Sequence, residues 1–212
     1  MAGLKIYGTA RSRTARVLWM AKELGLAFEH VPLMMGDAAL KQPEFLKINP
    51  AGRIPAIDDD GFTLSESLAI NLYLARKYGD RATPSLAPAS LEEEAKFWQW
   101  SSWAMTDLEI PLNLIHLHRN FFPPEKRDSK VAEAAEVQVQ RPLTMLESIL
   151  ADSAYLLGAR FTVADINVAS VLSASRLSAI NMAPFPHIAA WTKRCHERPA
   201  AIAVQAMREA GL

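Results

Sequence analysis

Cysteine is nearly absent from this sequence, its charges cancel, and it has no long hydrophobic run. Only Cys195 among the 212 residues is a cysteine, which excludes an internal disulfide and a metal site built from several cysteines. Lysine and arginine together number 23, as do aspartate and glutamate, so net charge predicts no binding to nucleic acid or to an anionic membrane. No apolar run reaches the length that crosses a bilayer, and the first residues lack the apolar core of a signal peptide. We therefore expect a cytoplasmic protein, and no metal site is predicted.

The first 80 residues mix strand and helix patterns. Short apolar or alternating runs predict strands, and two stretches with apolar residues on one helical face predict helices. The expected strands are 4–7, 28–31, 54–57 and 62–64, and the expected helices are 13–24 and 66–78. This order predicts an α/β domain over residues 1–80.

The remainder of the chain is predicted to be helical. Pro84 and Pro88 bracket a stretch without periodicity, so residues 81–89 are expected to form a linker. Helices are expected over 91–120 with a bend near Pro111, then over 129–150, 163–178, 187–196 and 199–209. Capping boxes mark two of the starts, formed by Ser90 with Glu93 and by Thr162 with Asp165. Residues 90–212 are therefore expected to form an all-α domain.

Pro55 is the first residue that suggests a binding role. It falls at the start of an expected strand, and only an X–Pro bond adopts the cis geometry at low cost. A cis Ile54–Pro55 bond would turn the backbone groups of Ile54 outward, where they could pair strand-fashion with a peptide-like ligand. The alternative is a proline that merely begins an edge strand.

Glu66 and Ser67 open the expected helix that follows. The first N–H groups of a helix and its positive dipole end favour a carboxylate, and the hydroxyl of Ser67 could join them. Glu66 could hold an ammonium group, so a zwitterionic amino-acid head group would satisfy both residues. The alternative is helix capping by Ser65 beside an exposed Glu66.

Together these segments resemble the cytosolic glutathione transferases, in a serine-type, theta-like form. The matching motifs are N-P-x-G-x-I-P-x-I at 49–57, E-S-x-A-I at 66–70, F-T-V-A-D at 161–165 and R-P-A at 198–200, so the resemblance covers the full chain. It implies a thioredoxin-like domain followed by an all-helical domain, with glutathione as co-substrate. It also implies a homodimer that activates the glutathione thiol as thiolate for attack on a hydrophobic electrophile, a detoxification reaction.

The segment 8–13 is the expected place for the group that stabilises this thiolate. Ser12 lies at the expected helix start and four residues before Arg16, the spacing of the activating serine in serine-type members, so we assign it as hydroxyl donor. The alternative is that Ser12 is a helix cap. Thr9, Tyr7 and Arg11 are rivals for the same role. No cysteine lies in this segment, which argues against mixed-disulfide chemistry.

Further contacts follow from the resemblance. Lys41 and Arg53 could neutralise the glycine carboxylate of glutathione, or be solvated charges. Asp107 could reach the glutathione amino group across a dimer interface, or lie on a helix surface. The expected electrophile pocket is lined by Thr9, Arg11, Trp103 and His116.

Two rival functions use the same fold. A glutathione-dependent isomerase is one, although such enzymes favour a serine-cysteine loop that this sequence lacks. The other is a non-catalytic binder of ligands or proteins, which need not keep the Ile54-Pro55 and Glu66-Ser67 pairs. No motif names the electrophile, nor does any decide between conjugation, isomerisation and peroxide reduction.

Overall fold

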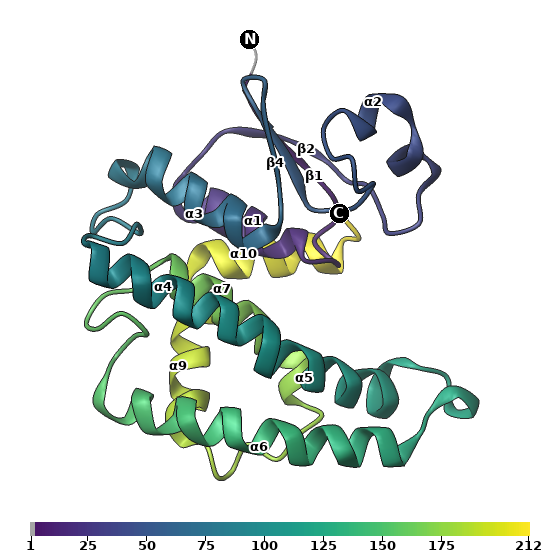
Figure 1. Ribbon diagram of the computed structural model, residues 1–212, viewed down its shortest axis with the longest axis vertical. Coiled ribbons are helices and arrows are strands. Elements are labelled where there is room, and N and C mark those ends of the chain that lie inside the picture. Colours follow the sequence, from purple (N-terminus) through teal and green to yellow (C-terminus); the bar gives the residue numbers. More distant parts are fainter. Residues whose placement is uncertain (1–2) are drawn as a thin grey trace. The chain divides into compact units, whose positions relative to one another are not determined.

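The computed structural model describes residues 3–212, except for the side chains of residues 174 and 175. Its contacts divide the chain into two compact units (Figure 1). The sheet unit comprises the chain up to Pro88 together with Glu197–Leu212, and the helical unit comprises Ala89–His196.

A four-stranded mixed sheet in the order β2-β1-β3-β4 organises the sheet unit. Its strands are β1 (Leu4–Tyr7), β2 (Phe28–Val31), β3 (Ala56–Asp59) and β4 (Phe62–Ser65). β1 runs parallel to β2 and antiparallel to β3, which forms a hairpin with β4. The predicted α/β order is confirmed. β3 begins two residues later than expected, because Pro55 has no N–H to donate to a sheet ladder.

Helices α1 (Thr14–Glu23) and α3 (Ser67–Tyr78) pack together against this sheet, and α2 (Pro43–Leu46) is a single short turn. The core between them holds fully buried aliphatic side chains, among them Ile6, Leu18, Ile57, Ile70 and Leu74.

The last helix, α10 (Pro199–Glu209), packs on α1. Arg198 donates from Nε and Nη2 to the two carboxylate oxygens of Glu23, at 2.8 and 2.7 Å. This two-point pairing fixes the start of α10 beside the end of α1. The compact unit of the sheet thus includes Glu197–Leu212, a segment that the sequence interpretation assigned to the domain of residues 90–212.

The helical unit contains α4 (Leu91–Trp103), α5 (Glu109–His116), α6 (Ser129–Asp152), α7 (Val163–Val171), α8 (Ala174–Leu177) and α9 (Pro186–His196). Two π-helical turns, Ala104–Leu108 and Leu117–Phe121, interrupt the expected helix 91–120. The irregularity thus lies before Pro111 rather than at it. Pro111 falls in the first turn of α5, where a missing N–H costs little.

The expected helix 163–178 is wrong in length, because α7 ends at Val171. Leu172 leaves the helical conformation, with φ −87° and ψ 50°, and the guanidinium of Arg176 donates to the carbonyl of Val171 at 2.9 Å. The Arg176 side chain thus donates to a carbonyl that would have accepted a backbone N–H if the helix had continued.

Asp165 joins three segments of the helical unit. Its Oδ2 accepts from the N–H of Thr162 at 2.9 Å and from the Thr162 hydroxyl at 3.1 Å, which confirms the predicted capping box. Its Oδ1 accepts from the N–H of Leu156 and from Nε1 of Trp191, both at 3.0 Å. The carboxyl group is fully buried, and burial raises its pKa above the ordinary value, an effect that the four donors offset only in part.

Among the residues that the structure describes, no helix is both long and apolar enough to cross a membrane.

Candidate functional site

The first part of the site is the turn that leads into β3. The Ile54–Pro55 bond is cis. Asn49 is buried and holds the turn, since its Nδ2 donates to the carbonyl of Arg53 at 2.6 Å and its Oδ1 accepts from the N–H of Ala51 at 3.1 Å. Pro55 is buried, while Ile54 is half-buried against a small apolar cluster. The asparagine therefore fixes the residue whose backbone was expected to meet a peptide-like ligand.

The second part is the junction between β4 and α3. Glu66 is the single residue between them, exposed and with φ 69°, a conformation that costs a non-glycine residue about 1–3 kcal/mol. It makes no side-chain capping bond to the helix. Ser67 begins α3, and its buried hydroxyl accepts from Nη1 of Arg16 at 3.3 Å. The serine is thus linked to a buried positive charge.

Ser12 lies in the turn between β1 and α1, one residue before the helix N-cap Arg13. Its half-buried hydroxyl can donate to the carbonyl of Thr9 at 2.8 Å or to Oγ1 of Thr14 at 2.9 Å, and it accepts from the N–H of Thr14 at 3.1 Å. The side chain therefore bonds a first-turn N–H, as a cap does. A serine hydroxyl carries one proton, so donation to a ligand would replace one of these two bonds.

Thr9 and Arg11 contact the C-terminal segment of the sheet unit. The buried Thr9 hydroxyl donates to the carbonyl of Leu212 at 2.8 Å, and Nε of Arg11 donates to the carbonyl of Arg208 at 3.1 Å. Both polar groups named as rivals of Ser12 thus have partners near the end of α10.

Tyr7 packs with the apolar cluster of Leu40, Phe45 and Ala56. Its ring meets that of Phe45 edge-on, with centroids 5.7 Å apart. Burial raises the pKa of the Tyr7 hydroxyl above its ordinary value. Tyr7 thus packs as a core side chain.

Gly8 brings these parts together. Its φ is 120°, and a Cβ built on it would lie 2.1 Å from Oγ1 of Thr14 and 2.9 Å from Cβ of Ile54. No larger residue fits there, so the loop that carries Ser12 and the turn that carries Ile54 are in direct contact. His30 adds a contact from β2, with its Nε2 2.7 Å from the carbonyl of Gly8.

The sequence was compared with family models and with known proteins. Residues 2–76 match the family model of the glutathione S-transferase N-terminal domain, and residues 111–199 match that of the C-terminal domain. Glutathione S-transferase 3 of Zea mays is 35% identical over 94% of this chain and 92% of its own length. The chain belongs to the glutathione S-transferase family.

Solved structures of the family have the same fold. A theta class glutathione S-transferase from Xanthomonas axonopodis pv. citri, with glutathione bound, is 30% identical with a TM-score of 0.83, over 95% of this chain and 96% of that one. Glutathione transferase F2 of Populus trichocarpa is 26% identical with a TM-score of 0.87, over 98% and 99%. The predicted family and the thioredoxin-like fold followed by a helical domain are thereby confirmed.

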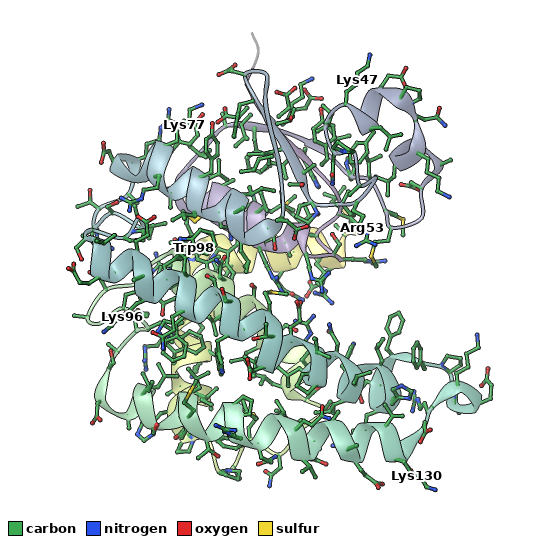
Figure 2. The ribbon with its side chains drawn as sticks, viewed as in Figure 1. Lys47, Arg53, Lys77, Lys96, Trp98 and Lys130 are labelled. Carbon is green, nitrogen blue, oxygen red and sulfur yellow. The ribbon has the colours of Figure 1, made fainter. Side chains whose placement is uncertain are left out.

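In this transferase the remaining predicted contacts are less closely grouped. Lys41 and Arg53 are both exposed in the sheet unit, and Arg53 directly precedes Ile54 in the chain. Figure 2 labels Arg53 among the side chains of this unit. The ring of His116 lies 6.1 Å from that of Phe121 at the end of α5. His116 is not among the residues that line the cavity that holds Trp103 and Asp107.

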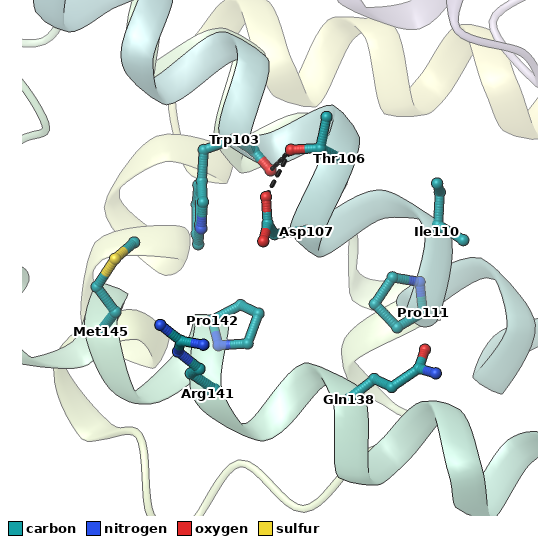
Figure 3. Close-up of a pocket in the computed structure, with 9 residues that line it drawn as sticks. All are labelled: Trp103, Thr106, Asp107, Ile110, Pro111, Gln138, Arg141, Pro142 and Met145. Atoms are coloured by element: carbon teal, nitrogen blue, oxygen red, sulfur yellow. Dashed lines mark hydrogen bonds between the residues drawn. The ribbon is translucent and has the colours of Figure 1, made fainter.

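That cavity, of about 650 Å³, lies within the helical unit between the α4–α5 segment and α6 (Figure 3). Its lining residues are Trp103, Thr106, Asp107, Ile110, Pro111, Gln138, Arg141, Pro142 and Met145. Asp107 is exposed in the first π-helical turn and accepts from the Thr106 hydroxyl at 2.5 Å. Two predicted ligand contacts, Asp107 and Trp103, thus share one cavity.

Four residues around the candidate site received no role in the sequence interpretation. Gly8, Arg16, His30 and Asn49 act through contacts that join segments distant in sequence or hold the turn before Ile54. One signal was available, because Arg16 places a charge beside the apolar residues of α1, and it is buried. The described residues contain no cluster of three or more His, Cys, Asp or Glu side chains that could hold a metal ion.

Proposed function

We propose that this protein is a glutathione transferase in which the Ser12 hydroxyl stabilises the glutathione thiolate for attack on a hydrophobic electrophile. The observation that carries the proposal is the close approach at Gly8, where a Cβ would lie 2.9 Å from Cβ of Ile54, so that the first residue of the Ser12 loop packs against the turn of Ile54. A peptide-like ligand paired with the Ile54 backbone would therefore lie beside the start of α1.

Thiol activation follows from the charges at this position. The thiolate is the nucleophile, and a free thiol has a pKa of about 8.5, so only a few per cent is ionised at neutral pH. A hydroxyl donor and the positive end of α1 both favour the charged form and lower the pKa of the thiol. The hydroxyl donor is Ser12. Because Ser12 lies just before Thr14, the first residue of α1, it is also at the positive end of that helix.

The other end of glutathione would lie at α3. The γ-glutamyl carboxylate would meet the first N–H groups of α3 and the Ser67 hydroxyl, with the buried charge of Arg16 behind it. The carboxylate of Glu66 would pair with the ammonium group. Lys41 and Arg53 would neutralise the glycine carboxylate, as surface charges that need not be desolvated to do so.

The helical unit would supply contacts to the second substrate, the electrophile, and contacts to the partner subunit. Trp103 and His116, with Thr9 and Arg11, remain our proposed electrophile contacts, and Asp107 from the second subunit of a homodimer would reach the amino group of glutathione. A cytoplasmic location, detoxification as the role, and homodimer assembly rest on resemblance to the family.

Retention on immobilised glutathione, followed by elution with free glutathione, tests the binding claim. A panel of electrophiles with glutathione present then tests catalysis. We expect both retention and turnover of at least one electrophile. A protein that is not retained would contradict the proposal, whereas retention without any turnover would favour the non-catalytic binder.

A further inference from the structure

The C-terminal segment, Gly211–Leu212, lies against the loop that carries Ser12. The carbonyl of Leu212 accepts from the N–H of Ala10 at 2.7 Å and from the Thr9 hydroxyl at 2.8 Å. Figure 1 shows this end of the chain beside the end of β1. Two donors from consecutive loop residues therefore converge on one acceptor that is about 200 positions away in the sequence.

The end of α10 fixes the direction of that carbonyl. Gly211 has φ 81°, its N–H donates to the carbonyl of Arg208 at 3.2 Å, and the N–H of Leu212 donates to that of Met207 at 3.0 Å. These two bonds with a left-handed glycine make a Schellman motif, which ends a helix in one defined geometry. Nε of Arg11 donates to the same Arg208 carbonyl, adding a contact from the loop.

Thr9 carries this constraint to Ser12. The Thr9 hydroxyl is held by Leu212, while the Thr9 carbonyl accepts both the N–H of Ser12 at 3.0 Å and the Ser12 hydroxyl at 2.8 Å. Thr9 and Ala10 are both buried, so neither has water to replace a lost partner. A change in the C-terminal segment would therefore move the Thr9 carbonyl, which accepts the N–H of Ser12 and so fixes the loop backbone that carries the Ser12 hydroxyl.

We infer that Gly211–Leu212 positions the Ser12 loop for thiol activation, with Thr9 as the positioning residue between them. The inference rests on the proposed role of Ser12. Gly211 and Leu212 would then influence thiol activation through the position of the Ser12 loop, without contacting glutathione themselves.

Gly211→Ala tests this with a matched control in the same unit. Gly25, at the end of α1, has φ 60° and the same pair of bonds, from the N–H of Gly25 to Lys22 and from that of Leu26 to Ala21. A Cβ at Gly25 would meet nothing within 4 Å, and one at Gly211 would meet only Arg11 at 3.8 Å. Alanine therefore adds similar backbone strain at both sites.

We expect Gly211→Ala to raise the apparent pKa of the bound glutathione thiol and to lower kcat/KM at neutral pH about fivefold, the scale of one hydrogen bond. Gly25→Ala should change neither. The thiolate absorbance of bound glutathione, titrated against pH, gives the pKa without relying on turnover. Equal pH profiles for the two alanine variants would overturn the inference.

Thr9→Val tests the route through Thr9. It should lower kcat/KM by a similar factor, Thr9→Ser should recover most of the loss, and Thr9→Val should add less than twofold in the Gly211→Ala background. Effects that multiply would contradict the inference, because Thr9 would then act independently of the C-terminal segment. Wild-type protein that binds no glutathione would instead contradict the proposed function.

Discussion

At the first residue of α3, a buried charge holds the hydroxyl of Ser67. Arg16 is almost fully buried in α1, and its Nη1 donates to Ser67 Oγ at 3.3 Å. Asn71, also buried, donates from Nδ2 to the Arg16 carbonyl at 3.3 Å. The serine therefore links α1 to α3 and, in the proposed function, also bonds a carboxylate.

Replacing Ser67 with alanine should weaken glutathione binding about tenfold to a hundredfold, because a hydrogen bond to a charged group contributes about 1.5–3 kcal/mol. Ser65→Ala is the matched control, a half-buried serine two residues earlier at the end of β4. Isothermal titration with glutathione measures both. Equal affinities in the two variants would remove Ser67 from the proposed site.

Asp59 gives the sheet unit a dependence on pH. It is buried, and it accepts from Tyr78 at 2.8 and 3.0 Å, from Lys77 at 2.8 Å and from Tyr73 at 2.9 Å. Burial alone would raise the pKa of Asp59, but the hydrogen bonds from Lys77, Tyr78 and Tyr73 outweigh it and the pKa lies below its ordinary value. The ionised form is thus favoured more in the folded than in the unfolded chain.

Because the pKa of Asp59 is lower in the folded chain, its ionised carboxylate stabilises the fold fully at pH values above the unfolded pKa of about 3.9. This stabilisation is lost as the pH falls through the folded pKa. Asp59→Asn should therefore lower the free energy of unfolding at pH 7 by about 2 kcal/mol and flatten its acid dependence. Urea unfolding as a function of pH measures this, with the exposed neighbour in Asp60→Asn as control. An unchanged acid dependence in Asp59→Asn would contradict the assignment.

At the scale of elements, two of the residues that cap helices in the helical unit, Ser90 and Asp165, differ in the number of bonds they accept. Ser90 accepts one bond at the exposed start of α4, from the N–H of Glu93 at 3.2 Å. Asp165 accepts four bonds, joining the start of α7 to Leu156 and to Trp191 of α9.

Asp165→Ala should therefore destabilise the protein by about 3–5 kcal/mol, since it leaves several buried donors without an acceptor. Ser90→Ala should cost about 1 kcal/mol, the usual loss of an exposed cap. Guanidinium unfolding followed by tryptophan fluorescence compares them. Similar losses of unfolding free energy in the two variants would show that the bonds of Asp165 to Leu156 and Trp191 contribute nothing to stability.

Sequence patterns predicted elements well and the contacts between them poorly. The strands and the Thr162–Asp165 capping box followed from local chemistry, where the deciding residues are neighbours. The cis Ile54–Pro55 bond is one of the two alternatives that the sequence left open for Pro55. The π-helical turn Ala104–Leu108 was not predicted, because no residue type or spacing in this segment was used to distinguish it from an α-helix. The early end of α7 depends on the Arg176 side chain, and helix periodicity does not report such a bond.

The sequence led us to propose Ser12 and Ser67 as site residues, but it did not reveal the residues that bond to them or to their loop. Leu212 meets Thr9 across nearly the whole chain, and Arg16 meets Ser67 across 51 positions. Such pairings have no local signature. The one indication of such a pairing is Arg16, a charged residue that is buried beside the apolar residues of its helix.

At the scale of the whole molecule, the proposed homodimer makes a claim about Asp107. This exposed aspartate lies in a cavity with Trp103 and Arg141, and its proposed ligand is the glutathione amino group bound in the other subunit. It would then contribute to affinity without contributing to thiol activation.

Asp107→Ala should weaken glutathione binding about fivefold to tenfold while leaving the apparent pKa of the bound thiol unchanged. Glu133→Ala, at an exposed acidic residue of α6, controls for the loss of charge. Calorimetry at protein concentrations above and below the dimer dissociation constant separates binding from assembly. Full affinity in Asp107→Ala would make this residue a surface charge.

The apparent pKa of glutathione bound to wild-type protein and to Ser12→Ala tests the central claim most directly. Thiolate absorbance titrated from acid to alkaline pH measures it, and Ser65→Ala serves as the control. We expect the pKa of the bound thiol to lie below its free value of about 8.5 in the wild-type protein and in Ser65→Ala, and to rise toward that value in Ser12→Ala. An identical titration curve for wild-type protein and Ser12→Ala would contradict the role of Ser12.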